Sequence, residues 1–290
     1  MAGKDTGRGF RWSGGLLAEE DPDPVGHERP ESRSGILILV DHAGQLVPVR
    51  LQRLGLPGGE LDRHIAWDIG ALGVAKRLSA ALDAELIYQR YSRLVIDCNR
   101  PLHVESAFVT QADGSQIHAN AVLGAREAGM RVAEIFHPYH AAIAAALDRR
   151  HAEGQPTALV SIHSFTPSHG DHPAPRPWQI SVLFNRDDRL GLALAASLEA
   201  DGDVVVGVNE PYVVDDEGDY SIPVHAEARG LAHVEIEIRQ DLIAADGGQA
   251  DWAGRLARLI PAALEKLGPP GAWTRATARA DVEGIEGTSA

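Results

Sequence analysis

The chain has 290 residues, of which 44% are hydrophobic and 23% charged, with a net charge of −14 and a single cysteine, Cys98. One cysteine excludes a disulfide framework and a cysteine-rich zinc module, and the negative charge argues against nucleic acid as a partner because the phosphate backbone would be repelled. No apolar run approaches the roughly 20 residues that cross a bilayer, and the first residues lack the apolar segment of a secretory signal. These features predict a cytoplasmic protein with no membrane partner.

The two ends of the chain differ in composition from its centre. Residues 1–33 are rich in glycine, proline and charged residues and show no hydrophobic periodicity, so we expect a flexible amino-terminal arm. Residues 268–290 are expected to form a disordered tail. Residues 34–267 are then expected to form a single domain, which is long enough to bury a sizeable core.

Hydrophobic periodicity predicts alternating strands and helices along this domain. In chain order, the predicted elements are a strand over residues 35–40, a helix over 60–82, short strands over 86–88 and 94–96, a loop over 102–125, a helix over 125–152, strands over 158–163 and 180–184, a helix over 189–198, strands over 204–208 and 231–239, and a helix over 251–267. Gly70 is expected to interrupt the first helix, and Pro138 to kink or divide the second. This alternation indicates an α/β fold with a mainly parallel sheet covered on both faces.

Two of the predicted strands lead directly into a histidine. Residues 35–40 (GILILV) are followed by Asp41 and His42, and the apolar run that begins at Ala158 ends at His163. Since open α/β sheets bind their ligands at the carboxyl ends of their strands, the two imidazoles are expected at one edge. Either histidine alone would be interpreted as a hydrogen-bonded core residue. As a pair they predict a metal site, because neutral imidazole is a common zinc ligand.

Three other segments give weaker signals. Residues 215–219 (DDEGD) are expected to form a solvated acidic turn, because they lack the ligand spacing of a calcium loop. Cys98 is a poor candidate nucleophile because the neighbouring Asp97 would raise the pKa of its thiol. Residues 70–73 (GALG) lack the preceding strand and the spacing that a dinucleotide-binding loop requires.

Six short motifs follow one another between residues 35 and 245. They are HAGQLVP at His42, HIAWDIGA at Asp68, YSRLVIDCNRP around Arg93, SIHSFTP at His163, NEPY at Asn209 and VEIEIRQDL at Glu237. In this order they resemble the N-formylglutamate amidohydrolase (deformylase) family, which is related to the zinc carboxypeptidases and aspartoacylases. The resemblance implies a phosphorylase/hydrolase-like α/β/α sandwich with a mainly parallel mixed sheet, similar to the zinc carboxypeptidases.

The resemblance also implies a zinc ion with three protein ligands and an open position for water. His42 and His163 would supply two ligands, and Asp68 is expected to be the third because its motif resembles the family's acidic position. Glu60 and His64 are the alternatives. The related carboxypeptidases and aspartoacylases have a glutamate three residues after the first histidine, where this chain has a glutamine, which is a poor third ligand.

Amide hydrolysis further needs a general base and a group that stabilises developing negative charge. Glu237 is expected to be the base, accepting a proton from the attacking water and returning it to the departing amine, because the arginine and aspartate that follow it match the related enzymes. Glu235 lies two residues away and faces the same side of the strand, so it is the alternative. Arg93 would polarise the scissile carbonyl and hold the oxyanion. Without the motif, a surface salt bridge is an equally good interpretation of this arginine.

The remaining predicted site residues would contact the substrate. Asn99 and Arg100 are adjacent, as in the carboxypeptidase pattern, and would bind a carboxylate through the bidentate guanidinium. Further candidates for lining the pocket are Tyr212, Arg176, His118 and His225.

Together these residues predict a zinc-dependent amidohydrolase that acts on an N-acyl amino acid or a similar small carboxylate, with N-formyl-L-glutamate as the substrate that the resemblance implies. One alternative is a carboxypeptidase-like enzyme or a deacylase for a different N-acyl amino acid or peptide. Another is a non-catalytic protein that binds a small carboxylate. Glu237 argues against the latter, because a pure binder needs no base beside the metal.

Overall fold

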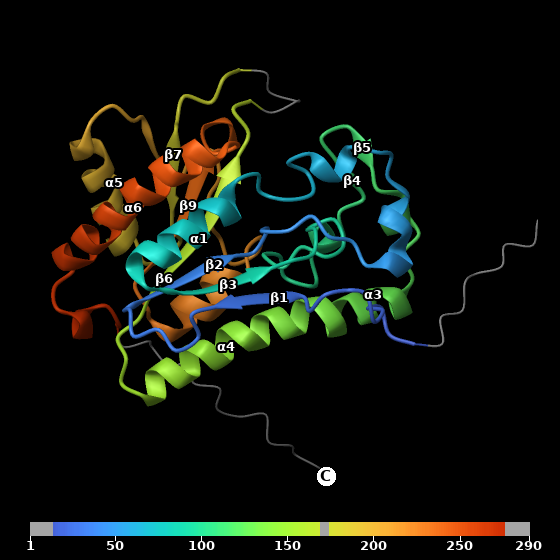
Figure 1. The fold of residues 1–290 in the computed structure, drawn as a ribbon, viewed down its shortest axis with the longest axis horizontal. Helices are drawn as coiled ribbons and strands as arrows, with labels where there is room; N and C mark the ends of the chain where they lie inside the picture. The colour runs from blue at the N-terminus through green and yellow to red at the C-terminus, as the bar shows by residue number, and fades with distance from the viewer. Residues whose placement is uncertain (1–13, 169–173, 276–290) are drawn as a thin grey trace, which may run out of the picture.

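The computed structural model describes residues 14–168 and 174–275 of the chain. Its centre is a seven-stranded sheet with the strand order β1-β3-β2-β6-β9-β7-β8 (Figure 1). The strands are β1 (Val25–Glu28), β2 (Ile36–Val40), β3 (Glu85–Gln89), β6 (Ala158–Phe165), β7 (Ile180–Leu183), β8 (Val206–Val208) and β9 (His233–Arg239). Strands β3, β2, β6 and β9 run parallel, β1 is antiparallel to β3, and β7 is antiparallel to β9 and parallel to β8. The predicted mainly parallel mixed sheet is confirmed.

Helices cover both faces of this sheet, as predicted. They are α1 (Ala71–Leu82), α2 (His118–Ala121), α3 (Ala125–Arg131), α4 (His137–Ala152), α5 (Arg189–Asp201) and α6 (Asp246–Lys266). Successive strand residues point to opposite faces, so Ile38 and Val160 pack with α1, α5 and α6, whereas Leu37 and Leu159 pack on the side of α4. Figure 1 shows α4 along one side of the sheet and α1, α5 and α6 on the other. The result is the α/β/α sandwich.

Two predicted helices are divided in the structure. Helix α1 begins only at Ala71, after Gly70 with a φ of 83°, where a side chain would collide with the backbone oxygen of Ile243. Residues 60–69 instead form a short 3-10 turn (Glu60–Asp62) and a loop. The helix predicted over residues 125–152 is α3 and α4 joined by a π-helical turn (Val132–Phe136). Pro138 lies in the first turn of α4, directly after this π-helical turn.

The strand predicted over residues 94–96 is wrong. Leu94, Val95 and Ile96 are fully buried or nearly so, but they form a turn. The amide of Val95 donates to Ser92, and the amide of Asp97 donates to the carbonyl of Ala107 in the following loop. The apolar side chains are therefore buried in the core beside α4, but the backbone forms no hydrogen bonds with a strand of the sheet. The predicted loop that follows contains a small hairpin of β4 (Gln111–Ala112) and β5 (Ser115–Gln116).

The predicted flexible arm is also wrong for its described part, residues 14–33. Strand β1 pairs with β3, and its Gly26 lies flat against the ring of Tyr88, where a side chain would collide. Leu16 is completely buried, and its amide donates to the carboxylate of Glu134 at 2.6 Å. Leu16 and Leu17 are apolar residues that the sequence offers as docking points, but composition gave no sign of the pairing of β1 with β3, because backbone hydrogen bonds supply it. Residues 1–13 lie outside the described residues.

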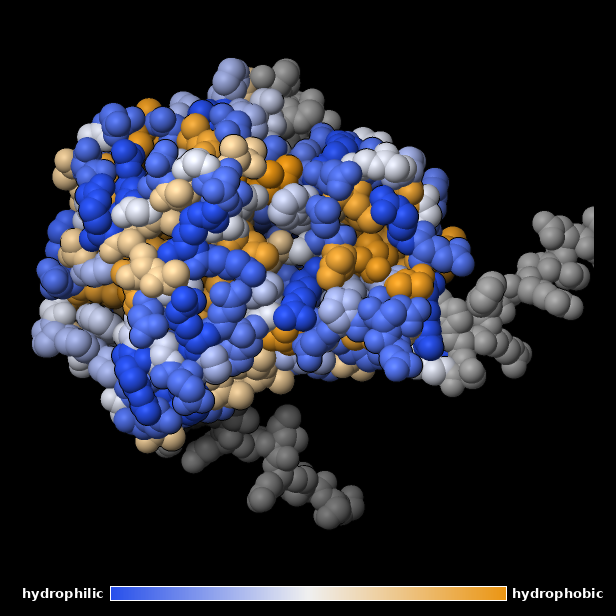
Figure 2. Space-filling view, viewed as in Figure 1, coloured by the Kyte–Doolittle hydropathy of each residue, from blue (hydrophilic) through white to orange (hydrophobic). Residues whose placement is uncertain are grey.

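The described part of the predicted tail, residues 268–275, also contacts the domain. The amide of Ala232 donates to the carbonyl of Trp273 at 2.7 Å, and Thr274 forms an antiparallel bridge with Leu231. Residues 276–290 lie outside the described residues. On the face shown in Figure 2, hydrophilic residues cover most of the surface, with hydrophobic patches between them. Among residues 14–168 and 174–275, no helix has the length and apolarity needed to cross a membrane.

Candidate metal centre and active site

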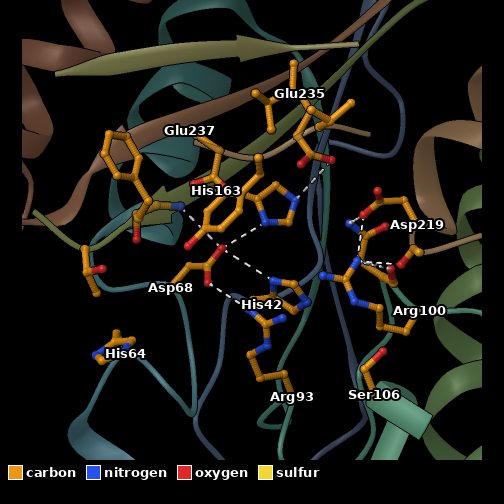
Figure 3. Close-up of a pocket in the computed structure, with 18 of the residues that line it drawn as sticks. His42, His64, Asp68, Arg93, Arg100, Ser106, His163, Asp219, Glu235 and Glu237 are labelled. Carbon is orange, nitrogen blue, oxygen red and sulfur yellow. Dashed lines mark hydrogen bonds and ion pairs between the residues drawn. The ribbon is translucent and has the colours of Figure 1, made fainter. Parts of the chain in front are cut away.

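The three predicted metal ligands meet at the carboxyl ends of neighbouring strands. His42 follows β2, His163 lies near the end of β6, and Asp68 lies in the loop before α1. One ligand atom from each lies within 4.8 Å of the others, and all three residues are buried. Figure 3 shows their side chains turned toward one another. Within the described ranges, no other group of histidine, cysteine or acidic side chains gathers in this way.

The two alternatives for the third ligand lie outside this cluster. Glu60 accepts hydrogen bonds from Arg63, at 2.7 Å, and from Ser115. His64 lines the same cavity, but its Nε2 lies 3.5 Å from the carboxylate of Asp113. The geometry therefore favours Asp68.

The orientation of both imidazoles suits metal binding. Nε2 of His42 donates to Asp97 at 2.7 Å, which leaves Nδ1 buried without a hydrogen-bond partner and 3.5 Å from Asp68. His163 directs Nδ1 to Asp68 at 2.9 Å, while its Nε2 lies 3.3 Å from the carboxylate of Asp41. Each ring thus presents Nδ1 to the shared space and places its other nitrogen beside a carboxylate, as metal-binding histidines do. Two imidazoles and one carboxylate are a donor set that fits zinc.

Buried acids hold these rings in place. Asp97 also accepts two hydrogen bonds from Arg93, at 3.0 and 2.7 Å, and Asp41 accepts one from Tyr139 at 2.9 Å and one from Ser221 at 2.6 Å. Burial alone would raise the pKa of Asp97, but the charges of Arg93 and His42 hold it well below its usual range. The sequence analysis assigned no role to Asp97 or Asp41. Both were visible at strand ends, but nothing in the sequence identified their partners.

Glu237 and Glu235 reach the same space from β9. In the sheet register Glu237 lies opposite His163, and Glu235 lies opposite Ser161. One carboxylate oxygen of each glutamate is buried without a hydrogen-bond partner. Burial is the largest cause of a raised pKa at both, well above the usual value at Glu237 and about 7 at Glu235. Both predicted base candidates therefore have an oxygen available for a ligand.

A cavity of about 470 Å³ lies over these groups and is lined by the predicted metal, catalytic and carboxylate-binding residues and by Tyr212, but not by Arg176. Arg176 instead lies behind Tyr212, donating to its hydroxyl at 3.2 Å and to the carbonyl of Thr166 at 3.2 Å. Its role as a substrate-binding residue stays a prediction, and its contacts in the structure are those of a support for Tyr212. Neither His118 nor His225 lines the cavity; His225 is buried and bonded to His140.

The predicted carboxylate grip is already occupied by the protein itself. Arg100 donates from Nη1 to Asp219 at 2.7 Å and to the carbonyl of Gly218 at 2.6 Å. The side-chain amide of Asn99 donates to Asp219 at 3.2 Å, and its oxygen accepts from the amide of Ser221 at 3.0 Å. Gly218 and Asp219, at the end of the acidic turn, thus pack into the site, whereas residues 215–217 are exposed as expected.

Comparison with protein-family models matches residues 34–244 to the N-formylglutamate amidohydrolase family. Among solved structures, a gene product of Agrobacterium tumefaciens shares 37% sequence identity and a TM-score of 0.84, over 88% of this chain and 100% of that chain. The N-formylglutamate amidohydrolase of Ralstonia eutropha JMP134 has the same fold, with 18% identity and a TM-score of 0.57 over 86% of this chain and 100% of that one. Comparison with curated proteins gave no match. Because the family match spans most of the chain, the protein belongs to the N-formylglutamate amidohydrolase family.

Proposed function

We propose that the protein hydrolyses the amide bond of an N-acyl amino acid of the N-formyl-L-glutamate type, with zinc held by His42, Asp68 and His163. The observation that carries this proposal is the cluster of three buried ligands beside Glu237 in one cavity. The unpartnered Nδ1 of His42 supports it, because a buried polar atom without a hydrogen bond is costly unless something binds it. When bound, zinc would supply Lewis acidity and lower the pKa of a coordinated water to about 7.

Glu237 would act as the general base. Its carboxylate lies across from His163 in the sheet register, lines the cavity, and has one oxygen free of hydrogen bonds. A carboxyl group whose pKa is raised by burial is a better proton acceptor than an exposed one, and the ideal catalytic pKa lies near the working pH. Glu237 would then return the proton to the departing amine.

Arg93 would stabilise the negative charge that develops on the scissile carbonyl. Its guanidinium is fixed by the two hydrogen bonds to Asp97 and lies 3.7 Å from Asp68, and the residue lines the cavity. A charge that is already in place costs no reorganisation when the reaction occurs. Arg100 and Tyr212 line the same cavity and would contact the rest of the substrate. The single, buried cysteine suits a reducing cytoplasm, where we place the reaction.

Two measurements on the purified protein test this function. Metal analysis should find about one zinc per chain, and incubation with N-formyl amino acids, glutamate among them, should release formate. Zinc content should fall sharply in His42→Ala and His163→Ala, since either change leaves two of three protein ligands. A protein that contains no metal after zinc loading, or that releases no formate while fully loaded, would contradict the proposal.

A further inference from the structure

The wall of the cavity contains a buried acid without a hydrogen-bond donor beside it. Glu235 is 5% exposed, lines the cavity, and has its Oε2 without a hydrogen-bond partner. Nε2 of His163 lies 3.8 Å from this oxygen, which is too far for a hydrogen bond. A buried carboxylate needs a donor to offset the loss of its hydration. A ligand group that carries N–H would supply one.

Arg100, which lines the same cavity, already pairs with an acid of the protein. The bond from its Nη1 to Asp219 is 2.7 Å long, and the carboxylate of Asp219 also accepts from Asn99 and from the amide of Asp215. Asp219 is therefore firmly held, and its side chain is only 11% exposed. Figure 3 shows Asp219 paired with Arg100 and, in the same cavity, Glu235 beside His163.

The charges around the cavity consequently favour a substrate with a single negative charge. Its two arginines, Arg93 and Arg100, each pair with an aspartate, while Glu235 and Glu237 also line it without an arginine or lysine partner. A bound zinc ion with the Asp68 carboxylate would add one net positive charge, but ionised Glu235 and Glu237 would outweigh it, so the site has no surplus positive charge for a second substrate carboxylate. A second carboxylate would meet like charge at low dielectric, where repulsion is strong.

We propose that Glu235, Asp219 and Arg100 select substrates whose side chain ends in a hydrogen-bond donor, a primary amide or an ammonium group, over substrates with a second carboxylate. This selection rests on the proposed N-acyl amino acid hydrolysis and narrows its substrate class. Glu235 accepts the donor, and Asp219 cancels the charge by which Arg100 would otherwise attract a second carboxylate. N-formylglutamine and N-formyllysine are then better substrates than N-formylglutamate.

The test compares these three substrates with the zinc-loaded enzyme. The wild type should show a kcat/KM at least about tenfold higher for the glutamine and lysine derivatives than for the glutamate derivative, the effect of roughly one like-charge contact. Asp219→Asn keeps an acceptor for Arg100 but removes the charge, so kcat/KM for N-formylglutamate should rise about tenfold. Glu235→Gln should reduce the preference for lysine over glutamate. Asp216→Asn is the matched control on the same turn, because Asp216 pairs with Arg186 outside the cavity.

Binding of the uncleaved N-acetyl analogues, measured by calorimetry, separates this inference from the proposed function. If no formyl compound is hydrolysed but the amide and ammonium analogues bind more tightly than the glutamate analogue, hydrolysis is refuted and the selection stands. If N-formylglutamate is hydrolysed as well as or better than the other two, the selection is refuted and the hydrolysis stands. If no analogue binds and none is hydrolysed, both are refuted. The wild-type comparison decides the matter even if a variant fails to fold.

Discussion

Replacing Glu237 with glutamine should slow hydrolysis without lowering the free energy of unfolding. Oε2 of Glu237 has no hydrogen-bond partner, and burial already favours the neutral form by raising the pKa of this carboxyl. Glu237→Gln therefore keeps the size of the side chain and removes a buried acid that is poorly compensated. We expect the free energy of unfolding to be unchanged or slightly higher.

The same substitution removes the proton acceptor. A positioned acid or base contributes about 10² to 10⁴ in rate, so kcat should fall by that factor, equivalent to about 2.7 to 5.5 kcal/mol of transition-state stabilisation. KM should change little, because Arg100 and Tyr212 remain in place to bind the substrate. Zinc content should also be retained, since the three proposed ligands are untouched.

The assay is formate release by the zinc-loaded variant, with metal analysis and thermal unfolding on the same preparation. Glu199→Gln, an exposed acid on α5, is the control for the procedure and should behave as wild type. Wild-type turnover in Glu237→Gln would refute the assignment of the base, and a matching loss in Glu235→Gln would transfer the role to that residue. A variant that loses its zinc would instead make Glu237 part of the metal centre.

Three further outcomes are expected. Asp68→Asn should weaken zinc binding, measured by competition with a chelator, far more than Glu60→Gln. The reverse order would make Glu60 the third ligand. Asp97→Asn should lower zinc affinity about 10- to 100-fold, because the carboxylate orients His42, and unchanged affinity would remove that role. Burial raises the pKa of Glu85, but His27, Arg149 and Arg150 outweigh it and lower the pKa below the usual 4.5. Ionised Glu85 therefore stabilises the fold above about pH 4.5 and loses this effect as pH falls through its folded-state pKa. Glu85→Gln should lower the free energy of unfolding by about 3 kcal/mol at pH 7, and the difference from wild type should shrink in acid. A difference that stays constant with pH would contradict the ion pairs of Glu85.

The metal centre could be predicted from the sequence because it depends on where strands end. A run of buried residues that stops at His42, and a second that ends near His163, place both imidazoles at one edge of a parallel sheet whatever the details of packing. Alternation along β9 likewise placed Glu235 and Glu237 on one face before any contact was known. Asp68 was harder, because it lies in a loop, and only the family motif distinguished it from Glu60 and His64.

The rest of the site depends on contacts between distant segments that no local pattern records. Asp219 meets Arg100 across 119 residues of chain, and Asp97 meets His42 across 55. An acidic turn has the same composition whether it faces solvent or packs against an arginine, so the contact of Asp219 with Arg100 could not be predicted, although residues 215–217 are exposed as expected. The prediction of a strand over residues 94–96 was wrong for a related reason. Apolar residues indicate burial, and burial does not specify the hydrogen bonds of the backbone.

The distribution of unpartnered acids distinguishes structural from functional carboxylates in this fold. Glu85 is as buried as the acids of the site, but it accepts hydrogen bonds from His27 and Arg149. Asp41 and Asp97 are likewise saturated by neighbouring donors. Among the carboxylates of residues 14–168 and 174–275, only Glu235 and Glu237 have a fully buried oxygen without a hydrogen-bond partner. Buried acids with a structural role thus have hydrogen-bond donors within the protein. The fold leaves two acids unsatisfied at the one sheet edge where a metal and a substrate would supply the missing donors.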